Sequence, residues 1–178
     1  MNKKFLIIGG VITVLITVFL IWLFIESSKP LPGEKLSDLG RGHVPVGEKV
    51  DYNSNPPTSG KHYEEWIRAG VYTEPKDDRN LVHSLEHGYV IMSYKCAELS
   101  EECKNRRDQL AKIYEKKKQR KLIVVPRVNL DTNFALTAWI YLDKFDPSTS
   151  SGLSVSEVER IEKFIDVHIN QGPEKTME

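Results

Sequence analysis

The stretch LVHSLEHGYVIMSY, residues 81–94, decides the fold because a helix gives way to a strand inside it. The helix is predicted to begin with Asp78 as its N-cap and to run to His87. Gly88 ends it, since glycine adopts the left-handed backbone that closes many helices without strain. Residues 89–94 are rich in β-branched and aromatic side chains, which favours a strand.

The sequence downstream continues to alternate between helix and strand. A charged helix is predicted over residues 100–118, and strands are predicted over residues 121–128 and 135–142. Residues 154–170 have apolar side chains at helical spacing behind a capping box, which predicts an amphipathic helix. The expected domain is therefore of the α+β class with a β-α-β-β-α core.

The sequence before these elements is irregular. A short helix is expected over residues 63–69, ended by Gly70. Residues 40–62 show no sustained period, but their histidines and prolines are unusual in a plain spacer, so we expect an ordered segment that wraps the domain. Residues 26–39 are rich in Pro, Gly and Ser and are interpreted as a linker.

An apolar run without a charge covers residues 5–25 and, as a helix, would span roughly 30 Å of hydrocarbon. A cleaved signal peptide is the alternative, but the run is long and ends in bulky residues where a cleavage site needs small ones. We therefore expect a retained transmembrane helix. Lys3 and Lys4 precede it, which predicts a cytoplasmic tip at residues 1–4 and an extracytoplasmic domain at residues 40–174.

The composition is that of one folded domain on an anchor. The chain has 178 residues, 25 basic and 25 acidic side chains, 40% hydrophobic residues, three Trp and seven Tyr. This content favours a packed core over a disordered tail, and the charge balance does not favour a nucleic-acid partner. The expected partner is the lipid bilayer, which makes the chain a single-pass protein of the cell membrane.

Cys96 and Cys103 are the two cysteines of the chain. An even pair in an oxidising compartment favours a disulfide, with a free or metal-binding pair as the alternative. The sequence has no CxxC motif, so thiol oxidoreductase chemistry lacks its usual signature.

Four of the five histidines lie close together in the sequence, and the clustering suggests a metal site. On a helix, His83 and His87 have Cβ atoms roughly 5–6 Å apart on one face; on a strand they would be roughly 13 Å apart. Neutral imidazole suits zinc or copper. The predicted metal ligands are His43, His62, His83 and His87. In such a site Glu86 would orient a ligand or act as a base. Alternatively, these histidines cap and pack, and no ion binds.

The sequence from His83 to His87 also matches the HxxEH pattern of inverted zinc peptidases, in which two histidines bind zinc and the glutamate activates water. Against a peptidase, Gly88 and a strand follow the motif directly, and the domain is short for a substrate cleft. The acidic residues that could complete such a site are Glu157, Glu159 and Glu162.

Several segments resemble a bacterial family catalogued as domain of unknown function 3105. They include PPTSGKH at 56–62, LVHSLEHGYVIMSY at 81–94, ALTAWIYLDKFD at 135–146 and FIDVHINQGPE at 164–174. The PPTSGxH and HxLEHG motifs occur intact and in order, and the resemblance covers residues 40–174. It implies an anchored extracytoplasmic protein without an assigned activity, so no catalytic residue is carried over. It also implies that the four histidines belong to the family's motifs, which favours a metal site.

The leading hypothesis is therefore a membrane-anchored extracytoplasmic protein, non-enzymatic or at least of unassigned activity, that binds copper or zinc through the four histidines. A zinc hydrolase with Glu86 as base is the first alternative. A metal-free envelope scaffold or interaction domain is the second.

Overall fold

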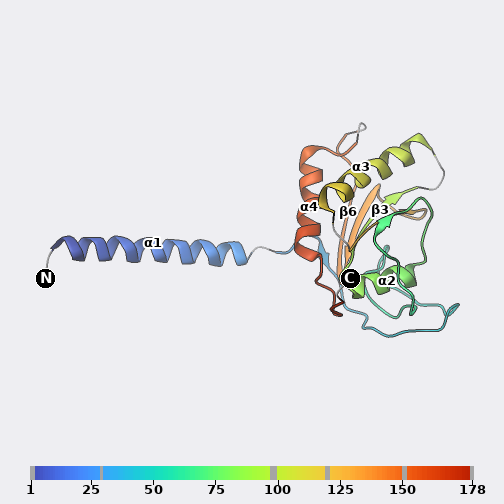
Figure 1. The fold of residues 1–178 in the computed structure, drawn as a ribbon, viewed down its shortest axis with the longest axis horizontal. Coiled ribbons are helices and arrows are strands. Elements are labelled where there is room, and N and C mark those ends of the chain that lie inside the picture. Colours follow the sequence, from blue (N-terminus) through green and yellow to red (C-terminus); the bar gives the residue numbers. More distant parts are fainter. Residues whose placement is uncertain (1–2, 29, 97–99, 119–120, 150–151, 177–178) are drawn as a thin grey trace. The chain divides into compact units, whose positions relative to one another are not determined.

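The structure is a computed structural model, and the residues it describes are 3–28, 30–96, 100–118, 121–149 and 152–176. The chain divides into two compact units, Met1–Leu31 and Pro32–Glu178 (Figure 1). The first unit contains the helix α1 (Lys3–Ser27). Within it, Ile8–Ile25 is long and apolar enough to cross a membrane, as an anchor or as a signal sequence.

The second unit is an α+β domain with a six-stranded mixed sheet, which confirms the predicted fold class. The strands are β1 (Glu34–Lys35), β2 (Gly70–Val71), β3 (Val90–Lys95), β4 (Leu122–Arg127), β5 (Phe134–Ala138) and β6 (Tyr141–Phe145). The helices are α2 (Asp78–Glu86), α3 (Glu101–Lys117) and α4 (Val155–His168). The strand order is β1-β6-β5-β3-β4-β2, with β4 parallel to β3 and β2 and the other neighbours antiparallel.

The two faces of this sheet are covered differently (Figure 1). On one face, here called the helical face, Val90 and Met92 of β3 pack with α3 and α4 in one core cluster. Ile91 points the other way because side chains alternate along a strand, and it packs with Leu85 of α2 in a second cluster. This second face, the site face, is covered by α2 and by the irregular segment that precedes it.

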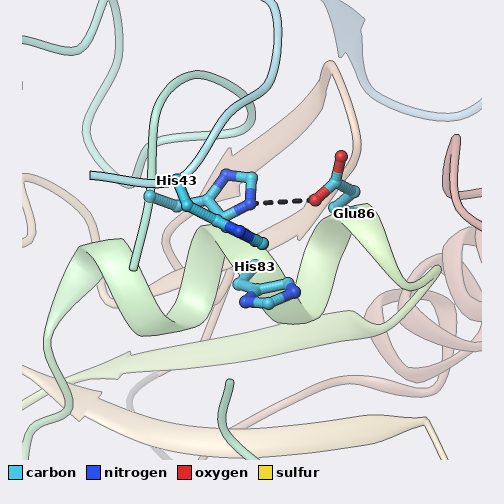
Figure 2. A group of neighbouring side chains, drawn as sticks. His43, His83 and Glu86 are labelled. Atoms are coloured by element: carbon cyan, nitrogen blue, oxygen red, sulfur yellow. Dashed lines mark ion pairs between the residues drawn. The ribbon is translucent and has the colours of Figure 1, made fainter. Parts of the chain in front are cut away.

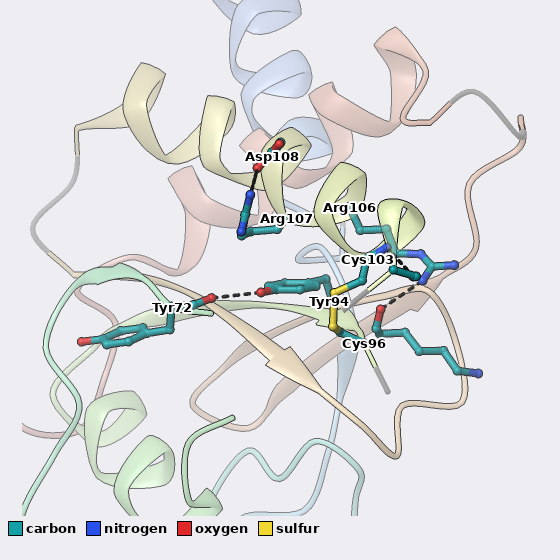
Figure 3. Close-up of a disulfide and its surroundings, with 9 residues drawn as sticks. Tyr72, Tyr94, Cys96, Cys103, Arg106, Arg107 and Asp108 are labelled. Carbon is teal, nitrogen blue, oxygen red and sulfur yellow. Dashed lines mark hydrogen bonds and ion pairs between the residues drawn. A yellow bond between two sulfur atoms is a disulfide. The ribbon is translucent and has the colours of Figure 1, made fainter. Parts of the chain in front are cut away.

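The disulfide between Cys96 and Cys103 is confirmed, with the two Cα atoms 5.2 Å apart. It ties the chain just after β3 to the first turn of α3 (Figure 3). Arg106 strengthens the junction by donating from Nη1 to the carbonyl oxygen of Lys95 at 3.0 Å. A disulfide together with an N-terminal apolar helix is consistent with an extracytoplasmic location.

The predicted strand over residues 135–142 is confirmed only in its first part, β5, because the chain turns back after it. β5 and β6 form a hairpin, and Ile140 in its turn has φ 60, in the left-handed region. Two bonds to earlier parts of the chain fix this turn: Ile140 N donates to the oxygen of Thr58 at 3.1 Å, and Leu36 N donates to the oxygen of Ile140 at 2.8 Å. The hairpin therefore adds one strand to the expected three, and the two-residue strands β1 and β2 complete the sheet of six in the described residues.

The predicted helix over residues 63–69 is also wrong, because α2 binds the backbone groups that a helix would use. Tyr63 N donates to the oxygen of Arg79 at 3.3 Å. The hydroxyl of Ser84 accepts from Ile67 N at 3.0 Å and donates to its oxygen at 2.8 Å. These bonds hold the segment extended along α2, where it covers the site face.

The other predicted elements are confirmed with small shifts at their ends. Ser100 caps α3, and Ser154 and Glu157 form the capping box of α4. Part of the expected linker is ordered, since β1 pairs with β6 and the second unit begins at Pro32. Its start is fixed by the buried His168, whose Nε2 donates to the oxygen of Pro32 at 2.8 Å.

Candidate metal centre

Helix α2 supplies half of the candidate site. Asp77 is its N-cap, one residue before the predicted one, and His87 is its C-cap. Gly88 follows with φ 82, and a Cβ there would lie 2.8 Å from Cα of Asn170, so both the backbone angle and the close packing require glycine. The apolar side of α2 packs on the sheet, which leaves its histidines and Glu86 buried under the irregular segment.

A short backbone pairing brings His43 and His62 together although 18 residues separate them in the sequence. Their segments form an isolated parallel bridge, in which Val44 N donates to the oxygen of His62 at 2.8 Å and His62 N donates to the oxygen of Gly42 at 3.0 Å. Paired residues of a bridge project to the same side, and the two ring centroids lie 5.2 Å apart. His62 is fully buried, whereas His43 is exposed.

Three histidines and one glutamate converge between this bridge and α2. Their potential ligand atoms all lie within 4.8 Å of one another. This inner cluster consists of His43, His62, His83 and Glu86. Figure 2 shows His83 and Glu86 extending from α2 toward His43 on the neighbouring segment. The closest polar contact joins Nε2 of His62 to Oε2 of Glu86 at 2.9 Å.

The backbone fixes the tautomer of both buried imidazoles. Nδ1 of His62 lies 2.8 Å from the oxygen of Gly60, and Nδ1 of His83 lies 2.8 Å from the oxygen of Tyr63. A carbonyl oxygen only accepts hydrogen bonds, so each Nδ1 carries the proton. In the neutral rings, each Nε2 therefore presents a lone pair to the cluster. Metal-ligating histidines are held in the same way, with the second nitrogen donating to a carbonyl or carboxylate.

The electrostatics of the inner cluster favour a neutral imidazole at His83. Burial, and then the nearby His62 and His87, lower the pKa of His83 to about 4, so its ring is neutral at pH 7. The lone pair of a neutral His62 would face the carboxylate of Glu86, which also only accepts. Two acceptors at this distance require a proton or a metal cation between them. Arg41 lies on the exposed side, with its Nε 3.7 Å from Oε1 of Glu86.

His87 lies next to the inner cluster but belongs to a second group. Its Nε2 is 3.1 Å from Nε2 of His83 and 3.6 Å from Oε2 of Glu174. This outer cluster consists of His83, His87 and Glu174. The structure thus divides the four predicted histidines between two overlapping groups, and Glu86 occupies the inner position that the sequence had suggested for His87.

Glu174 was missed because it lies beyond the last predicted helix, in a segment for which the sequence predicts no element. In the structure, this segment returns to α2, and Glu174 N donates to the oxygen of Glu86 at 3.0 Å. A Cβ on Gly172 would overlap that same oxygen, so only glycine permits the approach. Gly172 is therefore the residue in the sequence from which close packing of this segment against α2 could have been predicted.

The acidic residues proposed for a hydrolase site lie elsewhere. They belong to α4, which covers the helical face of the sheet, whereas both clusters lie on the site face. The carboxylate of Glu157 is bound to its own helix start at Ser154, and Glu162 pairs with Lys116 at 2.6 Å. Within the described residues, neither cluster contains Glu157, Glu159 or Glu162.

The chain was compared with protein families, with curated proteins and with solved structures, and one family matches it. A family model with the description "Protein of unknown function (DUF3105)" matches residues 43–178, a range that contains every member of both clusters. No curated protein and no solved structure matches the chain.

Proposed function

The chain belongs to the DUF3105 family of proteins of unknown function, and we propose that its second unit is an extracytoplasmic domain that binds one transition-metal ion, zinc or copper, in the inner cluster. In this proposal α1 is retained as a membrane anchor with its N-terminus in the cytoplasm. The apolar stretch of α1, the two lysines before it and the disulfide of the second unit support this placement.

The observation that carries the proposal is the fixed orientation of the two buried histidines. Carbonyl oxygens of Gly60 and Tyr63 accept from both Nδ1 atoms, so in neutral rings both Nε2 lone pairs point into the inner cluster. Nε2 of His62 and the carboxylate of Glu86 lie 2.9 Å apart and need a proton or a metal cation between them. In our proposal the metal ion takes this position, with His43 and His83 as the other two ligands.

The donor set fits zinc or copper. Three imidazoles and one carboxylate provide borderline nitrogen and hard oxygen donors, as zinc and divalent copper prefer. Four protein ligands would also fill a tetrahedral shell, which is typical of structural or carrier sites rather than catalytic ones. We therefore infer that the domain holds, delivers or senses the ion instead of using it to activate water.

The test is the metal content of the full chain purified in detergent, stripped with chelator and reloaded with Zn²⁺. The key variant is His62→Asn, because the Asn amide can still donate to Gly60 while the Nε2 ligand is removed. We expect about one ion in the wild type and a loss of at least about tenfold in affinity in the variant. Full retention of zinc by His62→Asn would contradict the proposal.

The matched control is His168→Gln on the helical face, where the amide can still donate to Pro32. It should bind zinc like the wild type. Circular dichroism of all variants separates loss of the site from loss of the fold. If the wild type itself binds neither zinc nor copper, the scaffold alternative replaces the metal-binding proposal.

A zinc hydrolase is supported by one specific observation, namely that the outer cluster has the two histidines and downstream glutamate that HxxEH enzymes use. In that case Glu86 would be the base and not a ligand. Glu86→Gln would then abolish hydrolysis while leaving zinc bound as tightly as in the wild type. In our proposal the same change weakens zinc binding, so one titration distinguishes the two functions.

A further inference from the structure

The inner and outer clusters share one ligand atom. Because Nδ1 of His83 donates to Tyr63, the ring has a single lone pair, on Nε2. That atom lies 3.1 Å from Nε2 of His87 and also belongs to the inner cluster. One lone pair binds one ion, so His83 serves the two clusters alternately and never together.

The outer cluster is held in place by a strap formed by the C-terminal segment, residues 170–176. Asn170 N donates to the oxygen of Gly88 at 2.8 Å. The buried Lys121 donates from Nζ to the oxygens of His87 at 2.8 Å and of Thr176 at 2.9 Å. Glu174 lies between these two attachments. Its carboxylate is therefore positioned beside His87 although its side chain is 52% exposed.

The exposed charged groups next to the two clusters differ in sign. Arg41, with a side chain 54% exposed, carries a positive charge beside Glu86 of the inner cluster. Glu174, with a side chain 52% exposed, carries a negative charge beside His87 of the outer cluster. A divalent cation approaching from solvent is repelled by Arg41 and attracted by Glu174.

We propose that the outer cluster is a transit position through which the metal ion reaches and leaves the inner cluster. The ion binds first to Glu174, His87 and His83. It keeps His83 while His62, His43 and Glu86 replace the two outer ligands, and release follows the reverse order. No electron is transferred, and each coordinate bond that breaks is replaced. The proton that Nε2 of His87 donates to Nε2 of His83 in the metal-free protein is released to solvent when the ion binds. This inference rests on the proposed function, because it assumes that the inner cluster is the resting site.

The experiment measures zinc exchange kinetics in the full chain in detergent. Zinc-loaded protein is mixed in a stopped-flow instrument with an excess of chromophoric chelator, and loading is followed in the reverse mixing experiment. Glu174→Gln is compared with Glu115→Gln, which makes the same charge change at an exposed position of α3 on the helical face.

For Glu174→Gln we expect loading and release both to slow by about tenfold, since the carboxylate stabilises the ion in transit. Because both rates fall together, the dissociation constant should stay within about threefold of the wild type and the stoichiometry should stay at one. His87→Ala should give the same pattern. Glu115→Gln should exchange zinc like the wild type.

Two results would overturn the transit position. Equal rates in Glu174→Gln and Glu115→Gln would show that the ion takes another route. A slower loading rate with an unchanged release rate would show that Glu174 only attracts cations from a distance. Neither result touches the proposed function, which fails separately if the wild type binds no zinc or if His62→Asn retains it.

Discussion

The helical face and the site face of the sheet are built in opposite ways. The helical face is covered by two long helices whose buried side chains are almost entirely apolar, such as Leu110 and Phe164. The site face is covered by a short helix and an irregular segment, and it buries His62, His83 and Glu86 among its apolar residues. The first arrangement provides stability through packing. The second places polar groups in a fixed geometry, at the cost of desolvating them.

The comparison shows where function is to be expected in this chain. Burying a polar group without a partner is unfavourable, so a cluster of such groups persists only if the surrounding structure or a ligand compensates. Backbone carbonyls compensate one nitrogen of each buried histidine. A bound cation would compensate the other, and the helical face has no comparable need.

The largest effect on stability is expected from a substitution in the core of the helical face. Phe164→Ala removes a fully buried ring between α4 and the sheet and should lower the free energy of unfolding by about 3–5 kcal/mol. Zinc stoichiometry of the folded fraction should not change, because the ring lies on the face opposite the clusters. Denaturant unfolding and metal analysis of the same sample check both statements. A loss of zinc from still folded protein would show that the two faces are coupled.

Removing the disulfide should give the next largest effect. With Cys96 and Cys103 seven positions apart, the loop is short, and replacing both by Ser should reduce the free energy of unfolding by about 2–3 kcal/mol. Zinc affinity should be unchanged, since the bond joins β3 to α3 and not to α2. Denaturant titration of the variant and of the oxidised wild type measures the difference. An unchanged unfolding midpoint would contradict the expectation.

Glu86→Gln tests the site face, where a substitution should affect zinc binding more than stability. The amide preserves the size of the side chain but removes the negative charge that faces His62. We expect the dissociation constant for Zn²⁺ to rise by roughly 10–100-fold while unfolding of the metal-free protein changes little. Competitive chelator titration provides the measurement, with Glu115→Gln as control. If the two variants bind zinc equally well, Glu86 is not a ligand.

The smallest effect concerns His168 on the helical face. Burial lowers its pKa below the ordinary 6.5, and Tyr141 is the titratable group in contact with its ring. The unfolded chain therefore binds more protons than the folded one as pH falls below about 6.5, so stability decreases in that direction. His168→Gln should reduce the drop in the unfolding midpoint between about pH 7.5 and about pH 5.5 in metal-free protein. An equal drop in both proteins would contradict this assignment.

Most of the helical face was predictable from the sequence because local patterns determine it. Caps, apolar spacing and β-branched runs correctly predicted α3, α4, β3 and β4. The hairpin was missed because its turn contains Ile140, a residue that rarely adopts a positive φ, and because the bonds that hold it come from distant Thr58 and Leu36. The local sequence contains no turn residue such as Gly or Asn from which this turn could be predicted.

The site face was predictable only in part. The clustering of four histidines in the sequence indicated that they form a site. The spacing of His83 and His87 on a helix correctly placed them next to each other. Spacing did not reveal that Glu86 and His87 belong to different clusters that share His83. Nor did it reveal Glu174, which reaches the site through long-range bonds of the strap. Bonds between distant segments decide these positions, and sequence periodicity does not encode them.

X-ray absorption spectroscopy of the zinc-loaded full chain tests the central claim most directly, because it counts the imidazoles around the ion. We predict three imidazole nitrogens and one carboxylate oxygen at about 2.0–2.2 Å, with the same spectrum in His87→Ala. Two imidazoles in the wild type, or a changed spectrum in His87→Ala, would place the resting ion in the outer cluster and contradict the account.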